Sequence, residues 1–314
     1  MSISSIPGLE NSEPDYEVPK RRHRVRASRV LLGLALVVPN VLLLLVFTYR
    51  PLVDNIRLSF FSWNIASTRP ATFIGLGNYI EWFTTPESWQ ILGQTAAFTV
   101  IAVLGSMVLG LALAMLLDQP LRGRNVVRSL VFAPYVISGA AVGVAFQFVF
   151  DPGYGLIQDL LGRIGLDSPQ FYTDPFWAMV MITSTYVWKN LGYTFVIYLA
   201  ALQGLRQDLR EAAEIDRTSP WRTFVRVTLP QLRPTTFFLS ITVLLNSFQV
   251  FDIIQVMTKG GPYGTSTTTL VYQVYQETFV NNRAGYGAAV ATIMFLIVLV
   301  VTVIQVRAGE RKQS

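Results

Sequence analysis

The sequence predicts an all-α protein that crosses a membrane six times. Of its 314 residues, 52% are hydrophobic and only 14% are charged, and the mean hydropathy is +0.43. A soluble globular protein usually carries about 25% charged residues. The composition therefore indicates that a lipid bilayer is the solvent of most of this chain.

The composition also excludes several kinds of catalytic site. The chain has no cysteine, so it forms neither disulfides nor thiolate metal sites. Its one histidine, His23, lies in a basic N-terminal segment, which argues against Ser-His catalysis and against a histidine metal site. No G-x-x-x-x-G-K-[ST] phosphate loop is present, so the chain is not itself an ATPase. We expect no catalytic residue, no metal and no cofactor bound by this chain.

Six segments are long and apolar enough to span the hydrocarbon. A spanning helix needs about 20 mostly apolar residues, because the hydrocarbon is about 30 Å thick and each residue rises about 1.5 Å. The predicted spans are residues 30–49, 91–117, 129–150, 176–205, 234–258 and 284–306. They contain two charged residues, Lys189 and Asp252. We expect the first span to be retained rather than cleaved as a signal peptide, because its apolar core is long and Arg50-Pro51 follows at once.

Basic residues predict the orientation of the spans. With both termini in the cytoplasm, the inner segments hold 18 of the 25 Lys and Arg residues, as the positive-inside rule requires. Residues 1–29 are then a cytoplasmic tail, acidic and disordered up to Pro19 and basic afterwards. Residues 30–306 form the membrane domain, with an inner loop at 205–233, and residues 307–314 form a second cytoplasmic tail. The basic cluster is interpreted as a topology anchor, with lipid or nucleic-acid binding as the alternative.

Polar side chains in the middle of two spans are candidates for ligand binding. A charge at the bilayer centre costs about 2.5 to 3.5 kcal/mol on insertion scales, so polar groups there face protein or water. The candidates in the fourth and fifth spans are Trp188, Asn190, Tyr193, Asn246 and Gln249, with Gln147 as a further one in the third. They fit a polyhydroxylated ligand, but they fit equally well as hydrogen bonds between helices. Lys189 and Asp252 could also form an interhelical ion pair.

The inner loop has the pattern of two short amphipathic helices. Asp208 can cap a first helix that runs through Asp216. A second helix should start at Ser219, with Pro220 in its first position, and end before Pro230. Apolar and cationic faces suit a groove on a partner protein, and the alternative is a hairpin that lies on the membrane surface.

The loop resembles the signature of the permease subunits of binding-protein-dependent ABC importers, in the sugar and glycerol-3-phosphate branch. That signature reads roughly Glu-Ala-Ala, two residues, Asp-Gly-Ala, then an aromatic residue and Leu-Pro. The matching residues here are Glu211-Ala212-Ala213, Asp216, Phe224 and Leu229-Pro230. Further similar pieces are residues 73–79, Pro134, residues 151–155, Leu202-Gln203 and residues 258–262. Arg217-Thr218 departs from the usual Gly-Ala.

This resemblance implies a type I importer permease fold and a transport function without enzyme activity. Two permeases would form the pore, two cytoplasmic ATPases would hold ATP and Mg, and an external binding protein would deliver the solute. The chain would then lie in a bacterial or archaeal cell membrane. The implied solutes are sugars, oligosaccharides, glycerol-3-phosphate or glycerophosphodiesters.

The resemblance also assigns residues by motif position. The implied ATPase-coupling residues are Glu211, Ala212, Ala213, Asp216, Arg222 and Phe224. The implied substrate contacts are Trp188, Asn190, Tyr193, Asn246 and Gln249. The turn at residues 260–262 and a helix at residues 272–279 are expected to face the binding protein.

One alternative function comes from a different class. A membrane-embedded glycosyl- or phosphotransferase acting on lipid-linked substrates would also need aromatic and amide groups at depth. Such an enzyme would need clustered carboxylates or a metal, and the densest acidic set shares no helical face: Asp151, Asp159, Asp167 and Asp174. Two roles are left for Lys189: it could bind the phosphate of a solute, or it could form an ion pair with Asp252.

Overall fold

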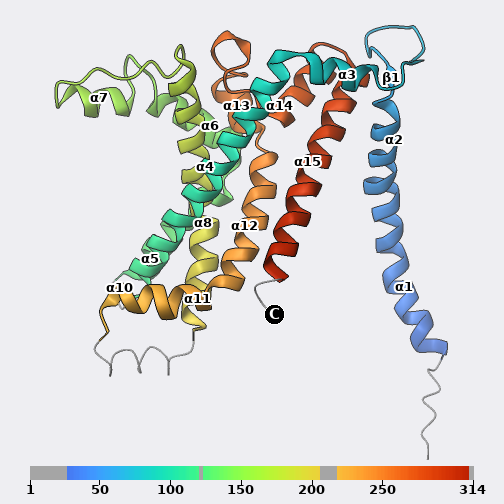
Figure 1. Ribbon diagram of the computed structural model, residues 1–314. Coiled ribbons are helices and arrows are strands. Elements are labelled where there is room, and N and C mark those ends of the chain that lie inside the picture. Colours follow the sequence, from blue (N-terminus) through green and yellow to red (C-terminus); the bar gives the residue numbers. More distant parts are fainter. Residues whose placement is uncertain (1–26, 120–122, 206–217, 311–314) are drawn as a thin grey trace, which may run out of the picture. The chain divides into compact units, whose positions relative to one another are not determined.

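The computed structural model describes residues 27–119, 123–205 and 218–310, and within them the chain is almost entirely helical (Figure 1). It divides into two compact units, Met1–Leu52 and Val53–Ser314. The predicted tail up to residue 26, the predicted loop helix at 208–216 and the last four residues lie outside the described ranges. The all-α prediction is confirmed.

The first predicted span is longer than the sequence suggested. Helix α1 (Ala27–Leu44) continues through a π-helical turn, η1 (Leu45–Tyr49), into α2 (Arg50–Leu58). The predicted end at Tyr49 is therefore wrong. In the π turn the Arg50 amide donates to the Leu45 carbonyl, five residues back. This wider turn comes just before Pro51, whose ring would otherwise press on the preceding turn of the helix.

The remaining elements form the second unit. In chain order they are β1 (Phe61–Ser62), β2 (Thr72–Phe73), α3 (Gly77–Thr84), α4 (Pro86–Leu117), α5 (Arg124–Val136), α6 (Gly139–Val149), α7 (Leu156–Gly162), α8 (Pro175–Gln203), α10 (Pro220–Thr223), η2 (Phe224–Thr228), α11 (Leu229–Gln231), α12 (Arg233–Phe248), α13 (Asp252–Met257), η3 (Pro262–Gly264), α14 (Leu270–Tyr275), η4 (Gln276–Val280) and α15 (Ala284–Glu310).

The predicted count of six spans is not confirmed by length and composition alone. Within the described residues four helices are long and apolar enough to cross a membrane: Leu32–Leu58, Pro86–Leu117, Arg233–Met257 and Ala284–Gly309. The bent pair α5 and α6 makes a fifth if the pair is one span. Helix α8 lies at the place of the predicted fourth span and has 29 residues, but its polar centre makes it less apolar than these.

Two predicted spans are broken rather than continuous. Helices α5 and α6 meet at an angle of 105°. Ile137 and Ser138 are extended there, and the Ser138 hydroxyl accepts a hydrogen bond from the Ala141 amide, which starts α6 as a separate helix. The fifth span is interrupted at residues 249–251, between α12 and α13. The sequence did not predict either break, because the mostly apolar residues continue through both positions.

The second loop helix begins where the sequence predicts, because Ser219 precedes α10 and Pro220 occupies its first turn. Its predicted end before Pro230 is wrong, because the helical run continues through η2 and α11 to Gln231. The Leu229 amide donates to the Phe224 carbonyl, so a π turn again precedes a proline. Figure 1 shows α10 and α11 at one end of the second unit.

The opposite end of this unit carries the other connecting segments, including α3, α7 and α14 (Figure 1). Strands β1 and β2 pair antiparallel, and the Asn78 amide of α3 donates to the carbonyls of Ser59 and Phe61 at 2.8 and 3.0 Å. The turn predicted at residues 260–262 is present, because Gly261 donates to the Thr258 carbonyl. The helix predicted at residues 272–279 corresponds to α14 and η4.

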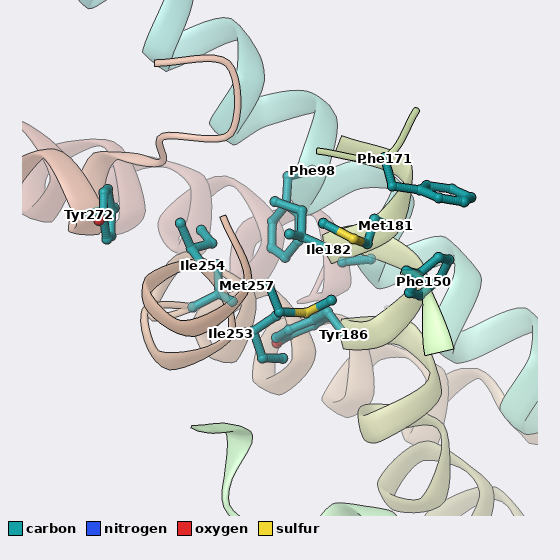
Figure 2. Close-up of a cluster of buried hydrophobic side chains, with 12 residues drawn as sticks. Phe98, Phe150, Phe171, Met181, Ile182, Tyr186, Ile253, Ile254, Met257 and Tyr272 are labelled. Carbon is teal, nitrogen blue, oxygen red and sulfur yellow. The ribbon is translucent and has the colours of Figure 1, made fainter. Parts of the chain in front are cut away.

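Helix α8 is the centre of the second unit. Figure 2 shows side chains of α8 meeting those of α4 and α13 in one buried cluster, to which Phe98, Tyr186 and Ile254 contribute. At Gly192 a side chain would collide with the backbone of α5 near Phe132, so glycine lets α5 and α8 approach closely. This contact fixes which residues of α5 lie over the midpoint of α8.

Candidate functional site

The midpoint of α8 exposes some of the predicted ligand residues and buries another. Trp188 is 41% exposed and packs against Phe146 of α6, with ring centroids 4.8 Å apart. Asn190 is only 7% exposed, and its Nδ2 donates to the Tyr186 carbonyl of its own helix at 2.9 Å. The structure therefore does not bring Asn190 to the surface that carries Trp188.

Two tyrosines and a lysine form a stack between α5 and α8. The rings of Tyr135 and Tyr193 are stacked, with centroids 5.1 Å apart and an interplanar angle of 24°. Lys189 Nζ donates to the Tyr135 carbonyl at 3.3 Å and lies 5.3 Å from the Tyr135 ring centroid. Sequence reasoning missed Tyr135. The sequence feature that could have identified it is a tyrosine inside an apolar span, directly after Pro134.

Helix α12 extends this polar region. The Tyr193 hydroxyl donates to Thr242 Oγ1 at 3.3 Å. Thr242 and Asn246 are four residues apart and share a helix face. Asn246 and Gln249 are exposed, and neither side-chain amide has a hydrogen-bond partner among the described residues. We define the polar strip as these residues: Tyr135, Lys189, Tyr193, Thr242, Asn246 and Gln249.

Asp252 does not form the ion pair with Lys189 that the sequence left open. No carboxylate of the described residues lies within 4.0 Å of Lys189 Nζ. The Asp252 carboxylate instead lies against Gly139, where a β-carbon would collide with it. Gly139 is the first residue of α6, so the carboxylate lies at the positive end of that helix dipole.

Gln147 holds two helices together rather than facing the polar strip. Its Nε2 donates to the Val256 carbonyl at 2.7 Å, which ties α6 to α13. The Tyr172 hydroxyl donates to the Gln147 carbonyl at 3.1 Å. We therefore assign Gln147 a structural role.

At the α10 end of the unit, an aromatic residue is highly exposed. Trp221 is 73% exposed and packs on Phe224, with ring centroids 5.6 Å apart. Arg222 beside it is exposed and Phe224 is half-buried. The other predicted coupling residues lie outside the described part of the chain: Glu211, Ala212, Ala213 and Asp216.

Three of the four acidic residues between α6 and α8 serve local structure. Asp151 accepts hydrogen bonds from the amides of Gly153 and Tyr154, Asp159 pairs with Arg163 at 2.7 Å, and Asp174 caps α8. In the residues that the structure describes, no group of three or more His, Cys, Asp or Glu side chains could hold a metal ion.

Comparison with known proteins places the chain in a family. The profile of the binding-protein-dependent transport system inner membrane component matches residues 106–313. The sulfoquinovosyl glycerol transport system permease protein SmoG of Agrobacterium fabrum is 35% identical over 282 residues, which cover 90% of this chain and 91% of that protein. The sn-glycerol-3-phosphate transport system permease protein UgpA of Pectobacterium atrosepticum is 36% identical over 241 residues, which cover 76% of this chain and 81% of that protein.

A solved structure shares the fold. A chain of a bacterial ABC transporter involved in the import of the acidic polysaccharide alginate superposes with a TM-score of 0.79, over 90% of this chain and 96% of that chain. Its sequence identity is 23%, so the likeness concerns the fold alone. None of these relatives supports the transferase alternative, because all of them are parts of transport systems. The chain belongs to the family of inner-membrane components of binding-protein-dependent transport systems, the non-enzymatic permease subunits of ABC importers.

Proposed function

We propose that this permease forms one half of an ATP-driven import pore for a carbohydrate or glycerophospho-type solute. A second permease supplies the other half, two copies of a cytoplasmic ATPase hold ATP and Mg, and an extracytoplasmic binding protein delivers the solute. The transport of sulfoquinovosyl glycerol by the SmoG system and of sn-glycerol-3-phosphate by the UgpA system supports this solute class.

The observation that carries the proposal is the exposure of Asn246 and Gln249, the two amides of the polar strip, in the middle of the fifth predicted span. Asn246 lies near the midpoint of the apolar run Arg233–Met257, and its amide has no partner in the described chain. Hydrocarbon cannot satisfy an amide, because each unpaired polar group there costs several kcal/mol. The strip therefore faces a second protein surface and the water-filled path between the two permeases. Trp188 adds an apolar platform beside it, while Asn190 acts as scaffold.

The segment from Glu211 to Pro230 is the proposed coupling region. Its described part places Trp221 and Arg222 in solvent at one end of the bundle, where an ATPase can bind them. Glu211, Ala212, Ala213 and Asp216 complete the region, and Phe224 packs under Trp221. The basic residues of this loop support a cytoplasmic location, with both termini on the same side of a bacterial or archaeal inner membrane.

Copurification and uptake test this function together. The chain, tagged in its own cells and purified in detergent, should bring down a nucleotide hydrolase and a second permease. The same complex in liposomes, with its binding protein outside, should take up a carbohydrate or glycerophosphate only when ATP is enclosed. A chain that purifies without a hydrolase, or uptake that ignores ATP, contradicts the proposal.

A further inference from the structure

Lys189 is a cation at the middle of a predicted span, and no carboxylate of the described residues lies within 4.0 Å of its Nζ. It occupies the midpoint of the 29-residue α8 and is half-buried. Within the described part of the chain its Nζ contacts the Tyr135 carbonyl at 3.3 Å and lies 5.3 Å from the centroid of the Tyr135 ring, and both groups are uncharged. From this position the side chain cannot reach either membrane surface, because each lies about 15 Å away along the helix.

The negative charge of the Asp252 carboxylate is already stabilised by the N-termini of two helices. Asp252 lies at the N-terminus of α6, against Gly139, where unpaired amides and the helix dipole stabilise a negative charge. Asp252 also lies in the first turn of α13, which stabilises it in the same way. The charge of Lys189 is therefore available to another anion.

The surroundings of Lys189 suit a solute rather than a purely structural anion. Tyr193 and Tyr135 form a stacked aromatic pair beside the ammonium group, and aromatic faces pack well on the apolar faces of sugars. The exposed Asn246 and Gln249 add amide donors and acceptors for hydroxyl groups on the adjoining face of α12. A cation, an aromatic surface and free amides together match a polyhydroxylated molecule that carries one negative group.

We infer that the solute is anionic, a sugar or glycerol derivative with a phosphate, sulfonate or carboxylate group that Lys189 contacts in the pore. The inference rests on the proposed function and narrows its solute class, because neutral sugars leave this charge without a partner. A charge-assisted hydrogen bond is about twice as strong as a neutral one, so the lysine discriminates between an anion and a hydroxyl at the same position.

Matched pairs of solutes test the inference in the complete reconstituted transporter. The probes are glycerol 3-phosphate and glycerol, a glucoside with a 6-sulfonate group and the parent glucoside, and a glucuronide and the corresponding glucoside. We expect ATP-driven uptake of at least one anionic member and little uptake of its neutral counterpart. Lys189→Gln should lower kcat/KM for the anionic member by about 10-fold or more, and Lys189→Arg should retain most of it.

The control and the contrary outcomes separate this inference from the proposed function. Arg69→Gln removes a positive charge from the exposed connection between β1 and β2 and should leave the preference unchanged. Equal uptake of the neutral counterpart, or unchanged anionic uptake in Lys189→Gln, overturns the inference while the importer function stands. If Lys189→Gln lowers the uptake of both solutes equally and the second permease no longer copurifies, Lys189 pairs with that subunit. This result also overturns the inference. ATP-driven uptake of no probe overturns the proposed function and the inference with it.

Discussion

The Asp252 carboxylate lies directly against Gly139, so the first turns of α13 and α6 meet at a position where any β-carbon would displace that carboxylate. Asp252 forms no ion pair with Lys189 in the part of the chain that the structure describes. Substitutions at Gly139 and at Asp252 test this contact.

Replacing Gly139 should destabilise the protein. In Gly139→Ala the new β-carbon collides with the Asp252 carboxylate, and overpacking of this kind costs about 1 to 3 kcal/mol. Thermal unfolding of the detergent-solubilised protein measures the loss. Gly93→Ala is the matched control, since nothing lies within 4 Å of its β-carbon and alanine favours the helix. Asp252→Ala added to Gly139→Ala should recover part of the loss, and a fully stable Gly139→Ala would contradict the contact.

Asn246 and Asn190 should respond differently to truncation. Asn246→Ala removes an exposed amide of the polar strip, and we expect transport efficiency to fall about 2- to 10-fold while the complex stays assembled. Asn190→Ala removes a buried amide that bonds its own helix, so it should lower the thermal midpoint more than the apparent solute affinity. Uptake kinetics and unfolding of both variants provide the comparison. Unchanged kinetics in Asn246→Ala would assign that residue to helix packing.

Glu211→Lys should abolish ATP-driven uptake and leave membrane insertion intact. The proposed reason is that the reversed charge repels the cationic surface of the ATPase. Uptake, ATPase copurification and the amount of protein in the membrane are the three measurements. Asp167→Lys makes the same charge change on an exposed residue between α7 and α8 and should transport normally. Normal transport by the Glu211 variant would remove the coupling assignment.

Glu277 should make stability depend on pH. Burial raises the pKa of this carboxyl above its ordinary value of 4.5, although Arg283 at 3.6 Å and the Asn281 amide at 3.2 Å lower it in part, and Glu81 and Glu87 raise it. An acid with a raised pKa stabilises the fold fully below 4.5, and this contribution is lost as the pH rises through the folded-state pKa. Thermal midpoints measured from about pH 4 to pH 8 should fall over that window.

The Glu277→Gln variant should flatten this pH slope, because the amide stays neutral. Asp167→Asn removes an exposed carboxylate that is not among the groups acting on Glu277, so the slope due to Glu277 should remain. An identical slope in wild type and Glu277→Gln would exclude Glu277 as its source.

The sequence predicts the positions of the uninterrupted spans well, but it does not predict where a helix that contains a proline ends. Helices α4 and α15 lie where long uncharged apolar runs require them. The first span was predicted to end at Tyr49 and the loop helix before Pro230, and both helices continue past these positions, through Pro51 and Pro230. A π turn precedes each proline, and residue types alone do not distinguish a proline that ends a helix from one that follows a widened turn.

The parts of the candidate site that the sequence did not predict depend on contacts between residues far apart in the chain. Polarity inside apolar spans identified Trp188, Tyr193, Asn246 and Gln249, and the structure leaves all but Tyr193 exposed. The same polarity could not separate Asn190, which is buried, from these residues. Tyr135 was missed because its place beside Lys189 depends on the close approach of α5 to α8.

Helices α6 and α13 are joined at both ends, by the Asp252 contact with Gly139 and by the Gln147 hydrogen bond to the Val256 carbonyl. Each of them follows a break in the chain, at residues 137–138 and 249–251. Because Gly139 and Asp252 directly follow the two breaks and contact each other, α6 and α13 begin side by side and form one two-helix unit. In the proposed pore, a tilt of α6 and α13 as one body would change the space next to Asn246 and Gln249 without unwinding α5 or α12.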